Sequence, residues 1–279
     1  MAGQPAGLIA CDVDGTLLTS AGRLSDRTRR ALVAARDAGW HVVVATGRPV
    51  SIALPVVEEL AVSEYLIAAN GSTVAELGTG AVIFQMALAA TLAREALRLA
   101  RTAVPGLGAA LLTTRGFVHE PGFVQVAPMT PAGGEVLDAT PGPDDDVLNL
   151  VVFRAGVSTS ELCAVLSAVL PDGMVASPSG LPGSAELTPP GVHKGSGLAR
   201  LCAHLGIAQD RVVAFGDGIN DLEMLAWAGT GVAMGNAEEL VQARADVVTA
   251  SNDDDGVAVV VERLVAAGGA GRPMAGAGQ

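Results

Sequence analysis

Short, almost continuous apolar segments recur at both ends of the chain. They span residues 7–10, 40–45, 65–69, 211–215, 230–234 and 246–249, and polar or glycine-containing loops follow them. Strands of this composition are buried on both faces, as strands of a parallel sheet are. Helices are predicted between them, from an N-cap at Ser25 to Ala38 and over 49–60, 198–205 and 256–266. This alternation predicts an α/β fold with a doubly wound parallel sheet.

The pattern changes near Gly80. Strands are predicted at 81–86, 109–114, 123–127, 147–153, 174–177 and 185–188, with helices over 87–104 and from the capping residue Ser158 to Leu170. Paired strands with helices between them indicate an α+β layer. We therefore expect residues 81–187 to form a second domain inserted into the first, which comprises residues 1–80 and 188–267. Residues 268–279 have too little apolar content to fold and are expected to be a disordered tail.

The charge balance is acidic, with a formal net charge of −12 and a pI of about 4.7. Binding to nucleic acid or to an anionic membrane requires a basic face, so neither partner is expected. The apolar runs have the length of strands, and the N-terminus lacks the pattern of a signal peptide, so we expect a cytoplasmic monomer or homodimer. Cys11, Cys163 and Cys202 lie in apolar surroundings and are expected to be reduced core thiols.

Two aspartates close the first predicted strand. Asp12 and Asp14 are two residues apart, and alternate residues of a strand point to the same face. Their carboxylates are therefore aimed at one point, where they would repel each other unless a divalent metal or a proton is held between them. Gly15 then permits a sharp turn and Thr16 offers a hydroxyl, as expected of a ligand-binding loop at the carboxyl end of a parallel strand. The alternative is an acidic turn without a ligand.

A second group of oxygen-bearing side chains follows the predicted strand at 211–215. Asp217, Asn220 and Asp221 lie in a segment whose glycines allow close approach of the backbone. Carboxylate and amide oxygens are the ligands that hard divalent cations prefer. The alternative is an acidic helix N-terminus, which the helix dipole favours without any metal.

Several further positions suit a phosphate group. Thr46 and Gly47 form a strand-to-helix junction with a hydroxyl and free backbone N–H groups. Lys194 is the single lysine beside sixteen arginines, and a compact ammonium fits where a broad guanidinium does not. Asn70 closes a third strand, although Asn-Gly is also a turn dipeptide. His193 is expected to be a loop residue rather than an acid–base group.

Four of these segments, in their order along the chain, resemble the motifs of the haloacid dehalogenase (HAD) superfamily of phosphatases. They are Asp12–Thr16, Thr46–Arg48, Lys194 and Gly216–Asp221. The segments at 214–225, 231–237 and 252–256 are similar to the Cof-like subgroup, in which a large α+β cap of type IIB (C2B) is inserted between the second and third motifs. The resemblance implies a Rossmann-like HAD core with an inserted α+β cap domain that determines substrate specificity. Cys11 stands where the family often has an aromatic residue.

The resemblance also implies a role for each matching residue. Asp12 would be the nucleophile that forms an aspartyl-phosphate, and Asp14 would protonate the leaving oxygen and then activate water. Four positions would hold or support Mg²⁺, and these are Asp12, Asp14 through its main-chain carbonyl, Asp217 and Asp221. Four positions would bind or support the phosphate, and these are Thr46, Gly47, Lys194 and Asn220. The residues alone agree with these roles, because phosphoryl transfer requires neutralised charge and in-line positioning.

The implied activity is that of a Mg²⁺-dependent phosphoric monoester hydrolase acting on a small phosphorylated metabolite, such as a sugar phosphate. A sugar phosphomutase and a weakly active binding or regulatory protein on the same fold are the alternatives. In the cap, Arg115, His119 and Glu120 surround a predicted hairpin turn. We expect them to be solvated residues of a loop tip rather than substrate contacts.

Overall fold

The computed structural model describes residues 6–113, 116–123 and 134–268. Arg115, the predicted strand residues 124–127 and the predicted tail beyond residue 268 lie outside the described residues. The chain divides into two compact units. Unit 1 comprises Met1–Thr46, Pro55–Phe84 and His193–Gln279, and unit 2 comprises Gly47–Leu54 and Gln85–Val192. Among the described residues, no helix combines the length and apolar content that a membrane crossing needs.

The described part of unit 1 is built on an eight-stranded sheet of order β15-β14-β13-β1-β2-β3-β4-β5. The strands are β1 (Gly7–Cys11), β2 (Trp40–Ala45), β3 (Tyr65–Ala68), β4 (Thr73–Glu76), β5 (Val82–Gln85), β13 (Val212–Gly216), β14 (Thr230–Ala233) and β15 (Val247–Val248). Pairing is parallel from β15 to β3 and antiparallel between β3 and β4. The central strands are buried throughout, which explains their continuous apolar sequences. The predicted parallel α/β sheet is confirmed.

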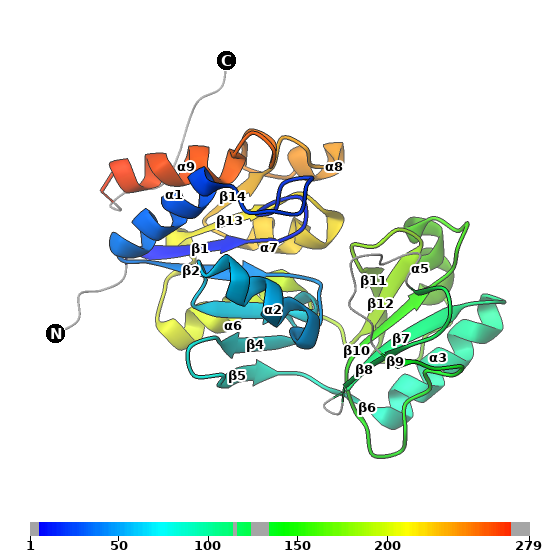
Figure 1. The fold of residues 1–279 in the computed structure, drawn as a ribbon. Coiled ribbons are helices and arrows are strands. Elements are labelled where there is room, and N and C mark those ends of the chain that lie inside the picture. Colours follow the sequence, from blue (N-terminus) through cyan, green and yellow to red (C-terminus); the bar gives the residue numbers. More distant parts are fainter. Residues whose placement is uncertain (1–5, 114–115, 124–133, 269–279) are drawn as a thin grey trace. The chain divides into compact units, whose positions relative to one another are not determined.

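Helices cover the faces of this sheet. They are α1 (Asp26–Asp37), α6 (Lys194–Leu205), α7 (Leu222–Trp227), α8 (Glu239–Gln242) and α9 (Gly256–Ala266), with α2 (Val50–Leu60) divided between the two units and short 3₁₀ turns η1 (Ala69–Gly71), η2 (Gln209–Arg211) and η3 (Ile219–Asp221). As predicted, Ser25 caps α1, with its side chain accepting a hydrogen bond from the N–H of Thr28 at 3.0 Å. Figure 1 shows α1 and α9 side by side, and an ion pair of 2.8 Å between Arg27 and Glu262 joins them.

Helix α6 begins four residues before the predicted start, at Lys194. His193 is its N-cap, because its Nδ1 accepts a hydrogen bond of 3.2 Å from the N–H of Ser196. Gly195 and Gly197 are poor helix formers, which is why the sequence favours a later start. Here they are required by packing, since a Cβ at Gly197 would lie 2.8 Å from Ile67 of β3. His193 is therefore the capping residue of α6.

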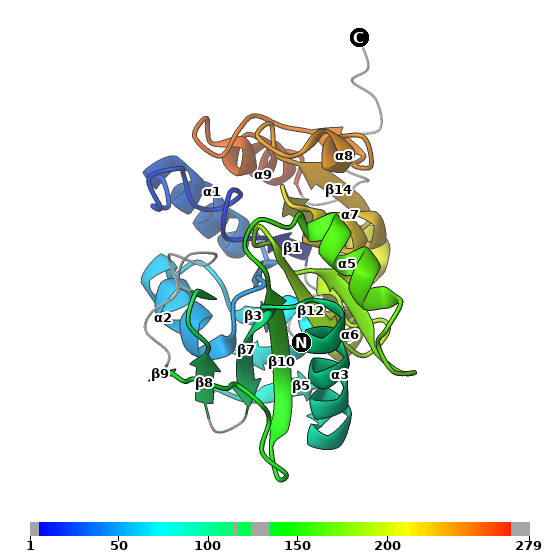
Figure 2. The same cartoon turned by 90° about the vertical axis from the view of Figure 1, so that its right-hand side faces the viewer.

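The described part of unit 2 is a seven-stranded, mostly antiparallel sheet of order β11-β12-β10-β7-β8-β9, with β6 paired to β10. The strands are β6 (Leu88–Ala89), β7 (Gly108–Thr113), β8 (Gly116–His119), β9 (Gly134–Glu135), β10 (Asp146–Phe153), β11 (Val175–Pro178) and β12 (Ser184–Thr188). Helices α3 (Ala90–Ala103) and α5 (Thr159–Ser167) pack on the sheet, as Figure 2 shows. The predicted α+β arrangement is confirmed. The strand predicted from Phe123 is wrong at that residue, which is helical.

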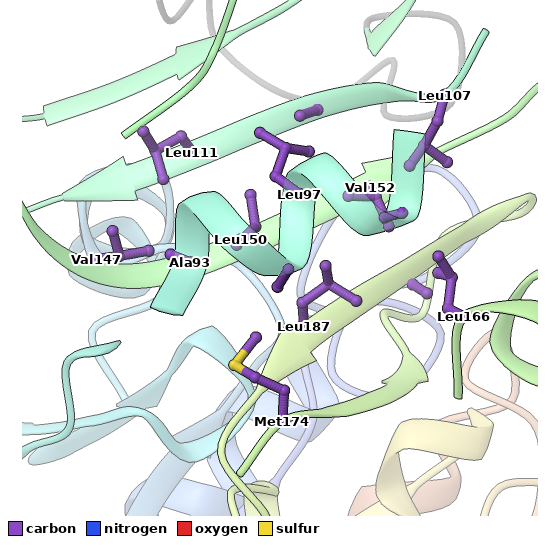
Figure 3. Packing of buried hydrophobic residues seen from close by; sticks show 14 of the residues in the cluster. Ala93, Leu97, Leu107, Leu111, Val147, Leu150, Val152, Leu166, Met174 and Leu187 are labelled. Carbon is purple, nitrogen blue, oxygen red and sulfur yellow. The ribbon is translucent and has the colours of Figure 1, made fainter. Parts of the chain in front are cut away.

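The core of unit 2 lies between these helices and the sheet. Figure 3 shows Ala93 and Leu97 of α3 over Leu150 and Val152 of β10, with Leu187 of β12 beside them. Each buried Leu or Val side chain contributes about 1.5–3 kcal/mol to the stability of the folded state. The three cysteines of the chain are free thiols, with Cys11 and Cys202 buried and Cys163 half-buried, as expected for reduced thiols.

Of Arg115, His119 and Glu120, which were predicted to be solvated residues of a loop tip, the structure describes the last two, and for both the prediction is wrong. His119 ends strand β8 and is 3% exposed, while Glu120 is 8% exposed. The Glu120 carboxylate accepts hydrogen bonds from the N–H groups of Ala109 at 3.1 Å and Ala139 at 2.8 Å, and it pairs with Arg101. Buried carboxylates need such partners, so Glu120 joins a helix, a strand and a loop of unit 2.

Candidate active site

Asp12 follows β1 at the carboxyl edge of the unit 1 sheet. Its N–H donates to the carbonyl of Phe215 in β13 at 3.0 Å, and its own carbonyl accepts from Leu17 at 3.2 Å. The residue is 6% exposed. Both sides of the turn are thus fixed by backbone hydrogen bonds, which place the carboxylate beside the segment that follows β13.

Lys194 contacts two aspartates of the site. Its ammonium donates to Oδ1 of Asp12 at 2.6 Å and to Oδ1 of Asp221 at 2.7 Å, although these residues are far apart in the sequence. The side chain is 1% exposed. Burial alone lowers the pKa of Lys194, but the charges and hydrogen bonds of the two aspartates outweigh it and raise the pKa above its ordinary value. The single lysine is therefore a permanent buried cation between two carboxylates.

Asp217 and Asp221 surround the other side of the site. Oδ2 of Asp221 accepts from the N–H groups of Asp217 at 3.1 Å and Gly218 at 3.0 Å, so both oxygens of this fully buried carboxylate are hydrogen-bonded. Oδ1 of Asp217 accepts from the hydroxyl of Thr16 at 2.7 Å. Asp221 is thus fastened to backbone and Lys194, while Asp217 is held through one hydroxyl.

Gly15 makes this approach possible. Its φ of +81° lies in the left-handed region that other residues rarely adopt. A Cβ at this position would also collide with the carboxylate of Asp217. The glycine therefore lets the loop after β1 and the loop after β13 meet.

The donor set and the charge fit a hard divalent cation. One carboxylate oxygen each of Asp12, Asp217 and Asp221 lies within 4.8 Å of the others, and the one ammonium of Lys194 leaves two negative charges uncompensated. Burial raises the pKa of Asp12, Lys194 opposes this rise, and the neighbouring aspartates add to it. Burial likewise raises the pKa of Asp217 to about 6. Oxygen ligands with excess negative charge are what Mg²⁺ requires, so the residues fit this ion.

Thr46 lies in the loop after β2, whereas Asn220 belongs to the same segment after β13 as Asp217 and Asp221. Thr46 follows β2, is 1% exposed, and accepts a hydrogen bond from the N–H of Asn70 at 3.1 Å through its carbonyl. The Asn220 side chain donates from Nδ2 to Oδ1 of Asn70 at 3.1 Å. Gly47 follows Thr46 in the chain and opens the Gly47–Leu54 segment of unit 2. The exposed Asp14 lies in the turn after Asp12, where it forms a backbone bridge with Leu18.

Two asparagines that the sequence reasoning did not single out hold the loop after β1. Nδ2 of Asn236 donates to the carbonyl of Gly15 at 2.8 Å, and Nδ2 of Asn252 donates to the carbonyl of Leu18 at 2.8 Å. Oδ1 of Asn236 accepts from the N–H of Asn252 at 2.9 Å, which joins them into an Asn236–Asn252 pair. They follow β14 and β15, at the same sheet edge as Asp12. That placement is the sequence signal by which they could have been found.

Known proteins resemble this chain over nearly its whole length. A family model described as haloacid dehalogenase-like hydrolase matches residues 9–261. The 5-amino-6-(5-phospho-D-ribitylamino)uracil phosphatase YcsE of Bacillus subtilis is 30% identical, with 92% of this chain and 95% of the relative covered. The HMP-PP phosphatase of Serratia proteamaculans is 31% identical, with 82% and 84% covered. The solved structure of the HAD subclass IIB sugar phosphatase BT4131 has a TM-score of 0.81 at 26% identity, with 92% and 98% covered.

Proposed function

The chain belongs to the haloacid dehalogenase-like hydrolase family, and on that basis we propose that it is a Mg²⁺-dependent phosphatase that hydrolyses small phosphorylated metabolites through an aspartyl-phosphate. The observation that carries this proposal is the buried contact of 2.6 Å between Lys194 and Asp12, inside a cluster of three aspartates. A carboxylate positioned beside a fixed cation can attack a phosphoryl group that is itself negatively charged.

Asp12 performs the first step in this proposal. An oxygen of its carboxylate forms a bond to phosphorus, and the bond from phosphorus to the ester oxygen breaks. Lys194 supports the step because its charge opposes the protonation of Asp12 that burial favours. In this proposal the hydroxyl of Thr46 would donate a hydrogen bond to a phosphoryl oxygen. Lys194 therefore keeps the attacking group ionised while it neutralises part of the phosphoryl charge.

Asp14 carries the proton. In the first step it donates its proton to the departing ester oxygen, and in the second it accepts a proton from the water that attacks phosphorus and releases Asp12. Its exposure suits this task, because a group that exchanges protons with water must be reached by it. Asp12 is enclosed and anchored, so the two carboxylates differ in environment as well as in role.

Asp12, Asp217 and the main-chain carbonyl of Asp14 would hold Mg²⁺, which would supply positive charge that offsets the negative charge of the phosphoryl group. Asp221 has a different task in this proposal. Both of its oxygens already accept hydrogen bonds, from Lys194 and from two backbone N–H groups. It supports the metal site by fixing Lys194 and the loop of Asp217.

The substrate is proposed to be a small phosphorylated molecule. The relatives act on a phosphoribitylamino-uracil, on HMP-PP and on sugar phosphates, as their names state. We assign the choice of leaving group to residues Gln85–Val192 of unit 2, a cap domain in this proposal that is shorter at its start than the predicted 81–187, because β5 belongs to the sheet of unit 1. The roles proposed for the residues around Asp12 concern only the phosphoryl group. One core chemistry then serves many leaving groups.

The test is release of inorganic phosphate by the purified chain from an aryl phosphate and from panels of sugar, nucleotide and cofactor phosphates. We expect release with Mg²⁺, none with a chelator, and none for Asp12→Asn, which keeps the shape of the side chain but not its charge. Absence of Mg²⁺-dependent release from every compound, with Asp12→Asn no different from wild type, would refute the proposal. A stable Asp12→Asn protein, checked by thermal unfolding, is the control for folding.

A further inference from the structure

The turn after β3 contains strained backbone beside the site. Ala69, Asn70 and Gly71 have φ values of 47°, 46° and 97°, so three successive residues occupy positive φ. Glycine accepts this region freely and asparagine tolerates it, but alanine does so at a cost of about 1–2 kcal/mol. Backbone of this kind persists only where its surroundings fix it, and it gathers at functional sites.

The surroundings of this turn are the predicted phosphate-binding groups. Asn70 donates from its N–H to the carbonyl of Thr46, and Oδ1 of Asn70 accepts from Nδ2 of Asn220. A Cβ at Gly71 would collide with the carbonyl of His193, directly before Lys194. All of these residues belong to unit 1. The strained turn therefore places the side chain of Asn70 among the loops of Thr46, Lys194 and Asn220.

One atom of this side chain remains unused. Asn70 is 4% exposed, and among the residues that the structure describes Nδ2 of Asn70 has no hydrogen-bond partner. Reversing the amide of Asn70 alone would set two NH₂ groups against each other at the contact with Asn220, where Nδ2 of Asn220 is the donor. A buried amide donor without an acceptor is costly, so such a group is expected to have a ligand.

We infer that Asn70 is a phosphoryl-binding residue, whose Nδ2 donates a hydrogen bond to an oxygen of the phosphoryl group. This inference rests on the proposed function, since the ligand is the group that Asp12 attacks. A phosphoryl oxygen is an anionic acceptor, and hydrogen bonds to charged acceptors are about twice as strong as neutral ones. The contact with Asn220 then has a clear purpose, which is to fix the direction of this donor.

Inorganic phosphate is the probe. Its binding to the full chain is measured by calorimetry at saturating Mg²⁺, together with its competitive inhibition of ester hydrolysis. Asn70→Gly removes the amide but permits the positive φ, and we expect phosphate affinity to fall about tenfold or more. Asn70→Asp keeps an acceptor for Asn220 but puts a carboxylate oxygen in place of the donor, so its affinity should fall further. Ala69→Gly is the matched control for backbone freedom in the same turn, and its phosphate affinity should equal that of wild type.

The order of the two variants separates a binding role from a structural one. If Asn70 only held Asn220, Asn70→Asp would resemble wild type more than Asn70→Gly does, and that order would overturn the inference. Wild-type affinity in Asn70→Gly would overturn it as well, and thermal unfolding of each variant identifies loss through misfolding. If the wild-type chain hydrolyses esters and either of these two variant results is found, the inference about Asn70 is refuted and the proposed function stands. If the wild-type chain neither binds phosphate nor releases it from esters, the proposed function is refuted as well.

Discussion

Replacing Lys194 by arginine keeps the charge of the site but changes its shape. The ammonium lies 2.6 Å from Asp12 and 2.7 Å from Asp221, and Lys194 is among the largest fully buried side chains described. A planar guanidinium needs more width and directs its N–H groups in one plane. We therefore expect Lys194→Arg to fold but to lose one of the two charge-assisted hydrogen bonds.

The size of the effect follows from that loss. A hydrogen bond to a charged group is worth about 1.5–3 kcal/mol, and forcing extra atoms into a packed interior costs about 1–3 kcal/mol. Each 1.4 kcal/mol of lost transition-state stabilisation is about tenfold in rate. We predict that kcat of Lys194→Arg falls by more than tenfold. Lys194→Met should lower kcat further, because it leaves the buried carboxylates without their cation. The same loss should lower the free energy of unfolding by about 3–5 kcal/mol.

The assay is steady-state release of phosphate at saturating Mg²⁺, with thermal unfolding of each variant. Arg30→Lys is the matched control for an arginine–lysine exchange at an exposed position of the same unit, and it should match wild type in both measurements. Near-wild-type kcat in Lys194→Arg would refute the reasoning, because it would show that a diffuse positive charge is sufficient between Asp12 and Asp221.

Three further predictions concern the loop after β1, the metal-free protein and unit 2. Gly15→Ala should lower kcat at least tenfold, by left-handed backbone strain and collision with Asp217, whereas Gly22→Ala, with φ +70° and open space, should cost only the strain. The pKa of Asp217 is about 6 when folded and about 3.9 when unfolded, so its contribution to metal-free stability is complete below pH 4 and lost as pH rises through 6. Mg²⁺ should therefore raise Tm more at about pH 7.5 than at about pH 5, and equal shifts would contradict this. In unit 2, Glu120→Ala should lower the free energy of unfolding, measured by denaturant titration, by about 2–4 kcal/mol, because it leaves two backbone N–H groups buried without an acceptor. Asp172→Ala, at an exposed position, is the control and should change this free energy little.

The sequence predicted correctly which residues of the candidate site follow parallel strands, because topology decides their position. Asp12, Thr46 and Asp217 each follow an apolar strand of one parallel sheet. The carboxyl ends of these strands lie at the same edge of the sheet. The sequence placed Lys194 near a helix start. It could not predict that the side chain contacts both Asp12 and Asp221, because that contact depends on how the helix packs at the sheet edge. The start of α6 was predicted four residues late for a related reason. The glycines that lower helix propensity there are required by packing, Gly195 against Glu223 of α7 and Gly197 against Ile67 of β3.

Unit 2 was harder to predict because some of its polar residues are buried by partners on other elements. His119 and Glu120 have the composition of a polar loop, yet β8 extends to His119 and pairs with β7. Burial of Glu120 depends on Arg101 of α3 and on the backbone of Ala139, which no local pattern reveals. Polar residues with distant partners are where local sequence reasoning fails first.

The Asn236–Asn252 pair bears on when the protein becomes functional during its synthesis. Contacts from Asn236 to Gly15 and from Asn252 to Leu18 span 221 and 234 residues, with all of unit 2 in between. Non-local contacts of this kind form late in folding, because the intervening chain must be ordered or closed into a loop first. The turn that carries Asp14 is therefore completed by residues that are synthesised after all of unit 2. A nascent chain that already contains Asp12, Asp14 and Lys194 should remain inactive until the segments after β14 and β15 have been added.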